Sequence, residues 1–295
     1  MTAPDVYGEA DHGHHPQIRE DARMPPVLTT PRSIAGAACR TPWGDAAAGL
    51  PGAADVELPK VVGFVVSRFS PLVHDVVTAC LGAPGTPHDL VGAAGPRTAV
   101  VLATLFGDTT TTDTATQRLV AGHVHSPLLF FQSVTTSILG YLTKQYGITG
   151  QITCLSAGHD TAAEALRAAD LLLDQEDVEQ VLVIGVEIEP HERATWVQGL
   201  TGAEDGLDPL PAGDAAVALL LRRAGAGADA PELRSLPGQP DREAGSTPSW
   251  AAAFGWLRAL VETAQAAERV RTGRVTRAVI HSTGPSRFLV GPATR

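Results

Sequence analysis

The strongest constraint on the fold is a strand–helix–strand pattern in the middle of the chain. A short apolar segment at 151–155 precedes an Ala/Leu-rich segment at 160–174, and a second apolar run covers 181–186. Short continuous apolar runs are typical of buried strands, whereas the longer Ala/Leu segment has the length of a helix. Similar apolar runs occur at 99–103 and 214–221. Strands that alternate with helices predict an α/β protein with mainly parallel strands.

The remaining elements are expected on both sides of this pattern. We expect strands at 33–38 and 278–281, and helices at 71–81, 113–120, 127–146 and 249–271. Gly147 is a suitable C-terminal residue for the helix at 127–146, which we expect to be continuous. The polar segment 1–31 is expected to be a flexible leader, 32–295 a single domain, and the Gly/Ala/Pro-rich segment 224–246 a surface loop.

Composition excludes several classes of function. The 295 residues are 44% apolar, which is enough for a sizeable core. The net charge of −10, with no basic cluster, argues against nucleic-acid binding. No apolar run approaches the ~20 residues of a membrane span, and the first residues lack the apolar core of a signal peptide. Cys39, Cys80 and Cys154 are too far apart for a disulfide or zinc pattern, so we expect reduced thiols and a cytoplasmic location.

The leader contains the one histidine-rich tract of the sequence. His12, His14 and His15 are close together, and such tracts sometimes bind metal. Here no acidic or cysteine partner stands at a helical spacing from them. We therefore expect no metal site.

The segment 140–187 resembles the centre of the β-ketoacyl synthases of the thiolase superfamily. The shared features are a helix that ends in the Tyr-Gly-x-x-Gly turn of 146–150, a strand, a turn, a helix, and a second strand that reaches Gly185. The resemblance implies a thiolase-like fold of two similar βα halves with mixed, mainly parallel sheets, shortened relative to full-length ketosynthases. In those enzymes a nucleophilic cysteine sits on the sharp turn. Counting from Gly147 or from Gly185 places His159 at that position.

The other catalytic groups of the ketosynthases are missing as well. Those enzymes use two histidines in the C-terminal half, whereas here no histidine occurs between His191 and His281. The residues before the helix at 249–271 are Ser246, Thr247 and Pro248, and 282–286 replaces the family's Gly-Phe-Gly-Gly turn. The resemblance therefore implies loss of condensing activity.

Two residues remain candidates for residual chemistry. His159 is a possible nucleophile or general acid–base group. Its alternative role is to fill the pocket of an inactive elbow. Cys154 would reach the elbow only after a shift of five residues, and on its predicted strand we expect it to be buried and inert.

Three segments are similar to short chain length factors of highly reducing, aryl-polyene-type type II polyketide synthases. They are Ser-Pro-Leu-Leu-Phe-Phe at 126–131, Leu-Ser-Ala-Gly-His-Asp at 155–160 and Asp-Ala-Ala-Val-Ala-Leu-Leu-Leu at 214–221. This likeness implies a non-catalytic subunit that forms a heterodimer with an active ketosynthase and shapes its acyl-chain tunnel. No cofactor of its own is implied, since the partner works on phosphopantetheine thioesters. The acyl carrier protein is expected to bind mainly through that partner.

In such subunits the residues that limit chain length lie on the helix before the elbow strand. Phe131, Val134, Thr135 and Ile138 recur here at three- and four-residue steps and would share one helical face. We expect this face, together with His159, to line the tunnel or the subunit interface. The alternative is that it packs against the core. Two other functions also remain open: an active acyltransferase or decarboxylase that uses Cys154 or His159, and a homodimeric structural or carrier-binding protein.

Overall fold

The computed structural model of the protein describes residues 26–53, 57–123, 127–200, 206–225, 230–237 and 248–293. The predicted leader, with His12, His14 and His15, lies almost wholly outside these ranges. Its last part is ordered, however, because Val27 and Leu28 are buried in the core. Val27 and Leu28 therefore belong to the packed domain, although they lie before residue 32.

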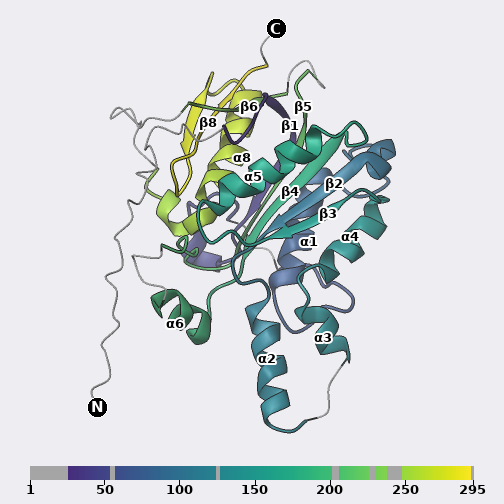
Figure 1. Ribbon diagram of the computed structural model, residues 1–295, viewed down its shortest axis with the longest axis vertical. Helices are drawn as coiled ribbons and strands as arrows, with labels where there is room; N and C mark the ends of the chain where they lie inside the picture. Colours follow the sequence, from purple (N-terminus) through teal and green to yellow (C-terminus); the bar gives the residue numbers. More distant parts are fainter. Residues whose placement is uncertain are drawn as a thin grey trace, which may run out of the picture.

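One mixed sheet of eight strands runs through the described molecule in the order β3-β2-β4-β5-β1-β6-β8-β7 (Figure 1). The strands are β1 (Arg32–Arg40), β2 (Thr98–Ala103), β3 (Ile152–Leu155), β4 (Gln180–Glu187), β5 (Ala215–Arg223), β6 (Glu232–Ser235), β7 (Ala278–His281) and β8 (Arg287–Gly291). The five strands from β3 to β1 in this order lie between residues 32 and 223, and the other three strands follow residue 231. The α/β fold class is confirmed.

The expectation of mainly parallel strands was wrong. β2 is parallel to β3 and to β4, but the other five neighbouring pairs are antiparallel. A continuous apolar run indicates that a strand is covered on both faces, and it carries no information about strand direction. β5, for example, is fully apolar from Ala215 to Leu221, and it runs antiparallel to both of its neighbours.

Helices cover both faces of the sheet, which explains the apolar runs (Figure 1). α1 (Phe69–Leu81) and α4 (Ser137–Tyr146) pack on one face, and α5 (Thr161–Leu173) and α8 (Arg258–Arg271) on the other. In β4, Val181 and Val183 enter the core under α5 and α8, whereas Leu182 and Ile184 enter the core under α1 and α4. Gly185 permits a close approach, because a Cβ there would lie 2.6 Å from Leu257 Cδ2.

The two longest predicted helices are each interrupted. The helix expected at 127–146 is α3 (Pro127–Ser133) followed by α4, with a break at 134–136. The hydroxyls of Ser133 and Ser137 donate to the carbonyls of Phe130 and Phe131, at 2.8 and 2.6 Å, and so compete with helical hydrogen bonds. The helix expected at 249–271 is a 3₁₀ segment, η3 (Ala251–Leu257), followed by α8, because Gly255 has a φ of 50°.

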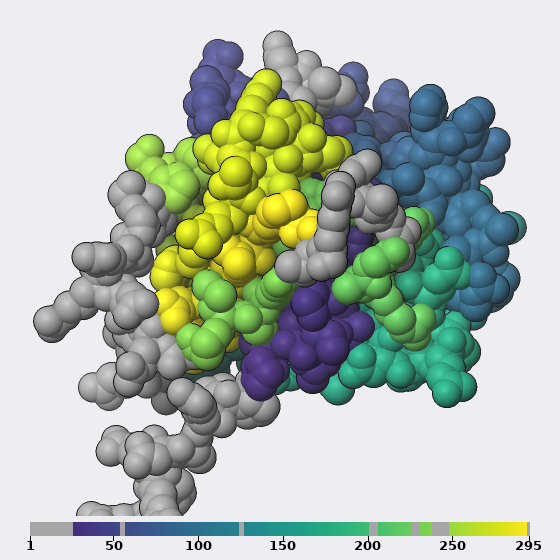
Figure 2. Space-filling view, turned by 90° about the horizontal axis from the view of Figure 1, so that it is seen from above, coloured from purple at the N-terminus to yellow at the C-terminus, as the bar shows by residue number. Residues whose placement is uncertain are grey.

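Other segments complete the molecule. α2 (Thr109–Val120) and α3 extend away from the sheet at the end where the chain leaves β2, and α6 (Glu192–Leu200) lies at the same end (Figure 1). Figure 2 views the opposite end, where C-terminal elements and the start of β1 lie.

The predicted surface loop at 224–246 contains β6, so that expectation was wrong for Glu232–Ser235. No helix in the described ranges is long and apolar enough to cross a bilayer.

Candidate functional site

The turn between β3 and α5, residues 156–160, is called the elbow. Asp160, its last residue, is the N-cap of α5 and has φ 48° and ψ 39°. It is the only described residue other than glycine with a positive φ. Left-handed backbone at a non-glycine residue is strained and is frequent at functional sites. The sharpest point of the elbow is therefore Asp160, one residue after the position that the resemblance indicated.

The carboxylate of Asp208 closes the N-terminal end of α5. Asp208 Oδ2 accepts a hydrogen bond of 2.7 Å from the backbone N–H of Thr161, the first residue of the helix. Asp208 Oδ1 accepts one of 2.6 Å from the hydroxyl of Thr283, in the loop between β7 and β8. Asp208 is buried, and only 4% of its surface is exposed. Sequence reasoning missed this residue, and its contacts join segments 47 and 75 residues apart.

The loop at 282–286 packs directly on the elbow. A Cβ on Gly284 would lie 2.7 Å from Oδ2 of Asp160, so this position requires glycine. Oδ1 of Asp160 and Oγ1 of Thr161 are buried and have no hydrogen-bond partner within the described protein. The elbow is thus closely packed and acidic at Asp160, whereas Ser156, Ala157 and His159 are exposed.

Neither of the two predicted reactive residues has the expected environment. His159 is exposed, so it does not fill an elbow pocket. Cys154 is exposed as well, because β3 is an edge strand and not a central one, and the expectation of burial was wrong. Partial burial of its sulfur still raises the pKa of the Cys154 thiol. Cys39 and Cys80 are buried, which raises the pKa of each thiol to about 12.

Glu187 is a buried carboxyl group that sequence reasoning did not identify. It follows the apolar part of β4, and that position was the only available signal. Its Oε1 accepts hydrogen bonds from Thr104 Oγ1 and Trp256 Nε1, both at 3.1 Å, and from the backbone N–H of Leu105. Burial raises the pKa of Glu187 to about 7, although these donors favour the charged form. Glu187 thereby joins β4, the residues that follow β2, and η3.

Stability is expected to fall with rising pH because of Glu187. Its folded pKa of about 7 exceeds the ordinary value of 4.5, so the folded state binds the proton more tightly. The resulting stabilisation is complete below pH 4.5 and is lost as the pH rises through 7; it amounts to roughly 3 kcal/mol at most. Urea unfolding between pH 5 and 8 should show a steeper fall of stability in the wild type than in Glu187→Gln, which keeps the contribution of Glu262, whose pKa burial also raises to about 7. Parallel stability curves for the two proteins would contradict the expectation.

The face predicted to line a tunnel is divided by the helix break. Phe131 and Val134 are exposed, Thr135 is half-buried, and Ile138 is buried in the core. The four residues therefore do not share one surface. Phe131 and Val134 remain candidates for an interface or a tunnel, whereas Ile138 has the alternative role of core packing.

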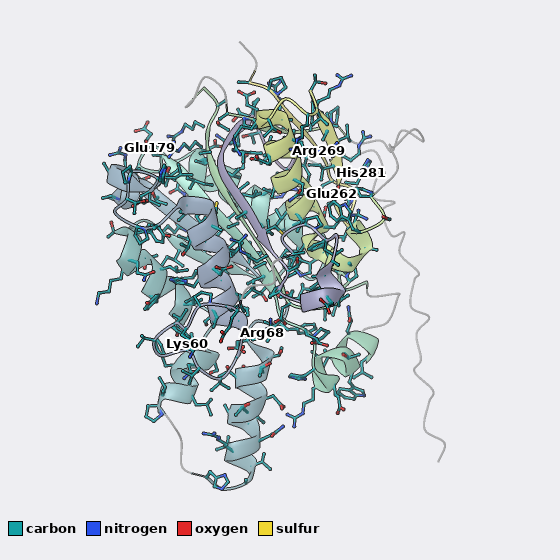
Figure 3. The ribbon with its side chains drawn as sticks, turned by 180° about the vertical axis from the view of Figure 1, so that it is seen from behind. Lys60, Arg68, Glu179, Glu262, Arg269 and His281 are labelled. Carbon is teal, nitrogen blue, oxygen red and sulfur yellow. The ribbon has the colours of Figure 1, made fainter. Side chains whose placement is uncertain are left out.

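Segment 57–71, which ends in the first turn of α1, forms an apolar cavity of about 620 Å³ next to α3. Phe64 lines it and contacts Phe131, with ring centroids 5.4 Å apart. Gln132 fixes the segment, because its buried Oε1 accepts the backbone N–H of Val65 at 3.0 Å. Lys60 and Arg68 also line the cavity and lie near the start of α1 (Figure 3).

A second cavity of about 220 Å³ lies between α2 and α6. Phe106, Thr109 and Val197 are among its lining residues. An ion pair of 2.6 Å between Asp113 and Arg193 joins the two helices beside it. Both cavities lie at the end of the molecule from which α2 and α3 extend.

Residues 66–274 match the family described as the β-ketoacyl synthase N-terminal domain. No curated protein matches the chain. Among solved structures, the chain is similar to one from a ketosynthase in complex with its chain length factor from Xenorhabdus doucetiae, with 17% identity and a TM-score of 0.56. That alignment covers 89% of this chain and 99% of the other. The chain is also similar to one from the complex of a type II polyketide acyl carrier protein with its ketosynthase, with 11% identity and a TM-score of 0.60. That alignment covers 90% of this chain and 99% of the other. At these identities the likeness establishes the fold.

Proposed function

Because this chain belongs to the β-ketoacyl synthase N-terminal domain family, we propose that it is a non-catalytic chain length factor. In this role it pairs with an active ketosynthase and shapes the acyl-chain tunnel in type II polyketide, polyene-forming biosynthesis. The elbow carries His159 and Asp160 in place of a cysteine, and the thiols of Cys39 and Cys80 are buried. One of the similar structures contains a ketosynthase with its chain length factor, which favours the same kind of pairing here.

The distribution of exposed apolar side chains is the observation that carries this proposal. Of the fourteen large apolar side chains exposed in the described part of the chain, eleven lie on segment 57–71, α2, α3 with the break after it, and α6. They are Val62, Val65, Leu119, Val120, Leu128, Phe130, Phe131, Val134, Trp196, Val197 and Leu200. These segments gather at one end of the molecule (Figure 1). Concentrated apolar surface of this kind marks an interaction site. We call these eleven residues the apolar end.

The open edge of the sheet supports the same role. β3 is the terminal strand, and Ile152 on it is 42% exposed. An unpaired strand edge offers backbone N–H and C=O groups to a strand of another chain. A ketosynthase strand added to β3 would make one continuous sheet across the two subunits.

The cavity between α2 and α6 suits the proposed tunnel. Its lining is mainly apolar, and Phe106 and Val197 offer walls against which an aliphatic chain can pack. A chain extended by the partner would enter from the apolar end and stop at a side chain. Steric closure discriminates between chain lengths better than added attraction, because one methylene in an apolar pocket is worth only ~1–3 kcal/mol.

Co-expression with an active ketosynthase from the same organism tests the proposal. We expect a stable one-to-one complex in size-exclusion chromatography with light scattering, and a lower soluble yield of this chain when it is expressed alone. The second candidate, a homodimeric structural or carrier-binding protein, is favoured by the same open edge of β3, which also fits a second copy. A well-folded homodimer that does not bind the ketosynthase would exclude the role of chain length factor and favour that alternative.

Alkylation by iodoacetamide distinguishes the active-enzyme alternative. In the isolated chain we expect one slowly reacting thiol, Cys154, because it is exposed but its pKa is raised by partial burial. In the complex Cys154 should be protected, since β3 would be covered. Peptide mass spectrometry gives the site and the rate. Rapid labelling that persists in the complex would favour an acyltransferase or decarboxylase.

A further inference from the structure

The N-terminus of α5 is already occupied by an anion from the same chain. The first N–H groups of a helix have no partner within the helix, and together with the helix dipole they attract negative charge. Here the N–H of Thr161 is bound at 2.7 Å by the carboxylate of Asp208. Thr283 holds the other carboxylate oxygen, and the N–H of Asp208 donates to the carbonyl of Gly158 at 2.7 Å. Asp208 is therefore fixed by three hydrogen bonds to two segments, residues 158–161 and the loop that contains Thr283.

The residues beside Asp208 contact the elbow. Leu207 Cδ2 lies 3.2 Å from where a Cβ on Gly158 would be, and the ring of His159 lies 3.6 Å from the Cβ position of Gly206. From the other side, Gly284 presses against the carboxylate of Asp160. Segments 206–208 and 282–286 thus pack against the Gly158–Asp160 side of the turn on which a ketosynthase carries its nucleophile.

This arrangement opposes the chemistry that an elbow otherwise supports. A thiolate at a helix N-terminus has a lowered pKa because the free N–H groups and the dipole stabilise its charge. With Asp208 in place, an anion at the elbow meets a neighbouring negative charge and loses the N–H of Thr161. Both effects favour the neutral thiol.

We infer that Asp208 is a built-in lock that keeps the elbow from serving as an acyl acceptor, whichever side chain stands at 159 or 160. This inference deepens the proposed non-catalytic role and rests on it. The loss of activity then has two independent parts, a missing nucleophile and an occupied helix N-terminus. A growing chain consequently stays on the cysteine of the partner.

The test restores a thiol to the elbow and measures its acidity. In a Cys154→Ser background, Asp160→Cys is prepared with and without Asp208→Asn, and the rate of alkylation by iodoacetamide is followed against pH. In this reaction the sulfur forms a bond to carbon, iodide leaves, and the thiol proton goes to solvent. Cys39 and Cys80 are not expected to react, because they are buried and burial raises the pKa of each thiol to about 12.

With Asp208 present we expect the new thiol to titrate at or above the ordinary ~8.5. Asp208→Asn should lower this pKa by at least about one unit. The alkylation rate at pH 7 then rises only about threefold, because a more acidic thiolate is also less nucleophilic. If Asp208→Asn does not fold, Asp208→Ser replaces it, since this change also removes the charge; a downward shift is again expected.

Glu164→Gln is the matched control. Glu164 is the acidic residue in the first turn of α5, and its side chain bonds Arg167 and not the N–H of Thr161. Its replacement should shift the pKa of the thiol by less than half as much. Equal shifts for the two variants, or a thiol pKa well below ~8.5 with Asp208 intact, would overturn the lock. Since the assay needs no partner, failure of the lock is distinguishable from failure to bind a ketosynthase.

Discussion

Replacing Asp170 by alanine is expected to lower the free energy of unfolding by about 3–5 kcal/mol, a large part of the stability of an ordinary domain. Asp170 on α5 and Arg32 on β1 are 1% and 3% exposed, and Asp170 Oδ1 lies 2.6 Å from Arg32 Nε. Thr29 donates two further hydrogen bonds of 2.9 Å to Oδ2. The substitution leaves a buried guanidinium without its main counter-charge, and it also releases the segment before β1.

Asp174→Ala is the control for this prediction. Asp174 also pairs with Arg32, at 2.5 Å, but it is 50% exposed, so water replaces much of what the carboxylate supplies. We expect a loss below about 1 kcal/mol. Urea denaturation at pH 7 measures both variants. Similar losses for Asp170→Ala and Asp174→Ala would mean that burial of the pair does not govern its energy.

The central elements were predictable because each combines a clear pattern with a clear end. β2, β4 and β5 are continuous apolar runs, and α5 has a strong Ala/Leu composition followed by an acidic stretch. β6 was missed because Leu233 is its only fully buried apolar side chain, so its sequence looks like a loop. Burial by long-range pairing, and not local composition, makes Glu232–Ser235 a strand.

At the elbow, the position of the turn was predictable from the sequence, but its backbone conformation was not. Spacing from Gly147 and Gly185 located the turn to within one residue, but the strained backbone lies at Asp160 and not at His159. Dihedral angles of a turn depend on how later segments pack against it. Asp208 and Gly284 supply that packing from segments far along the chain, and neither belongs to a local motif.

The prediction that Phe131, Val134, Thr135 and Ile138 share one helical face was wrong for a related reason. Steps of three and four residues define a face only if the helix is continuous, and the break at 134–136 separates Phe131 from Ile138. Val134, Thr135 and Thr136 are all β-branched, and such residues lose side-chain freedom in a helix. Three consecutive β-branched residues between Ser133 and Ser137 therefore favour a helix break, and periodicity alone does not predict it.

Phe131→Glu is expected to weaken binding to the ketosynthase by about 100-fold or more. Phe131 belongs to the apolar end, is 45% exposed, and contacts Phe64 beside the larger cavity. If the partner covers this residue, the substitution removes an aromatic contact and places a charge in an apolar interface. Aromatic residues at the centre of interfaces contribute 2 kcal/mol or more, and burying an unpaired charge adds to the loss. Titration of labelled ketosynthase with wild type and variant gives the ratio of dissociation constants.

Leu171→Glu separates a specific interface from a general effect of added charge. Leu171 lies on α5, away from the apolar end, and at 60% exposure it is at least as accessible as Phe131. We expect it to bind the ketosynthase within about twofold of wild type, because a solvated charge there has no partner to disturb. Matching thermal unfolding midpoints for the two variants show that the fold is intact. If Phe131→Glu binds as well as Leu171→Glu, the apolar end is not the surface that meets the ketosynthase, and the open edge of β3 must carry the pairing instead.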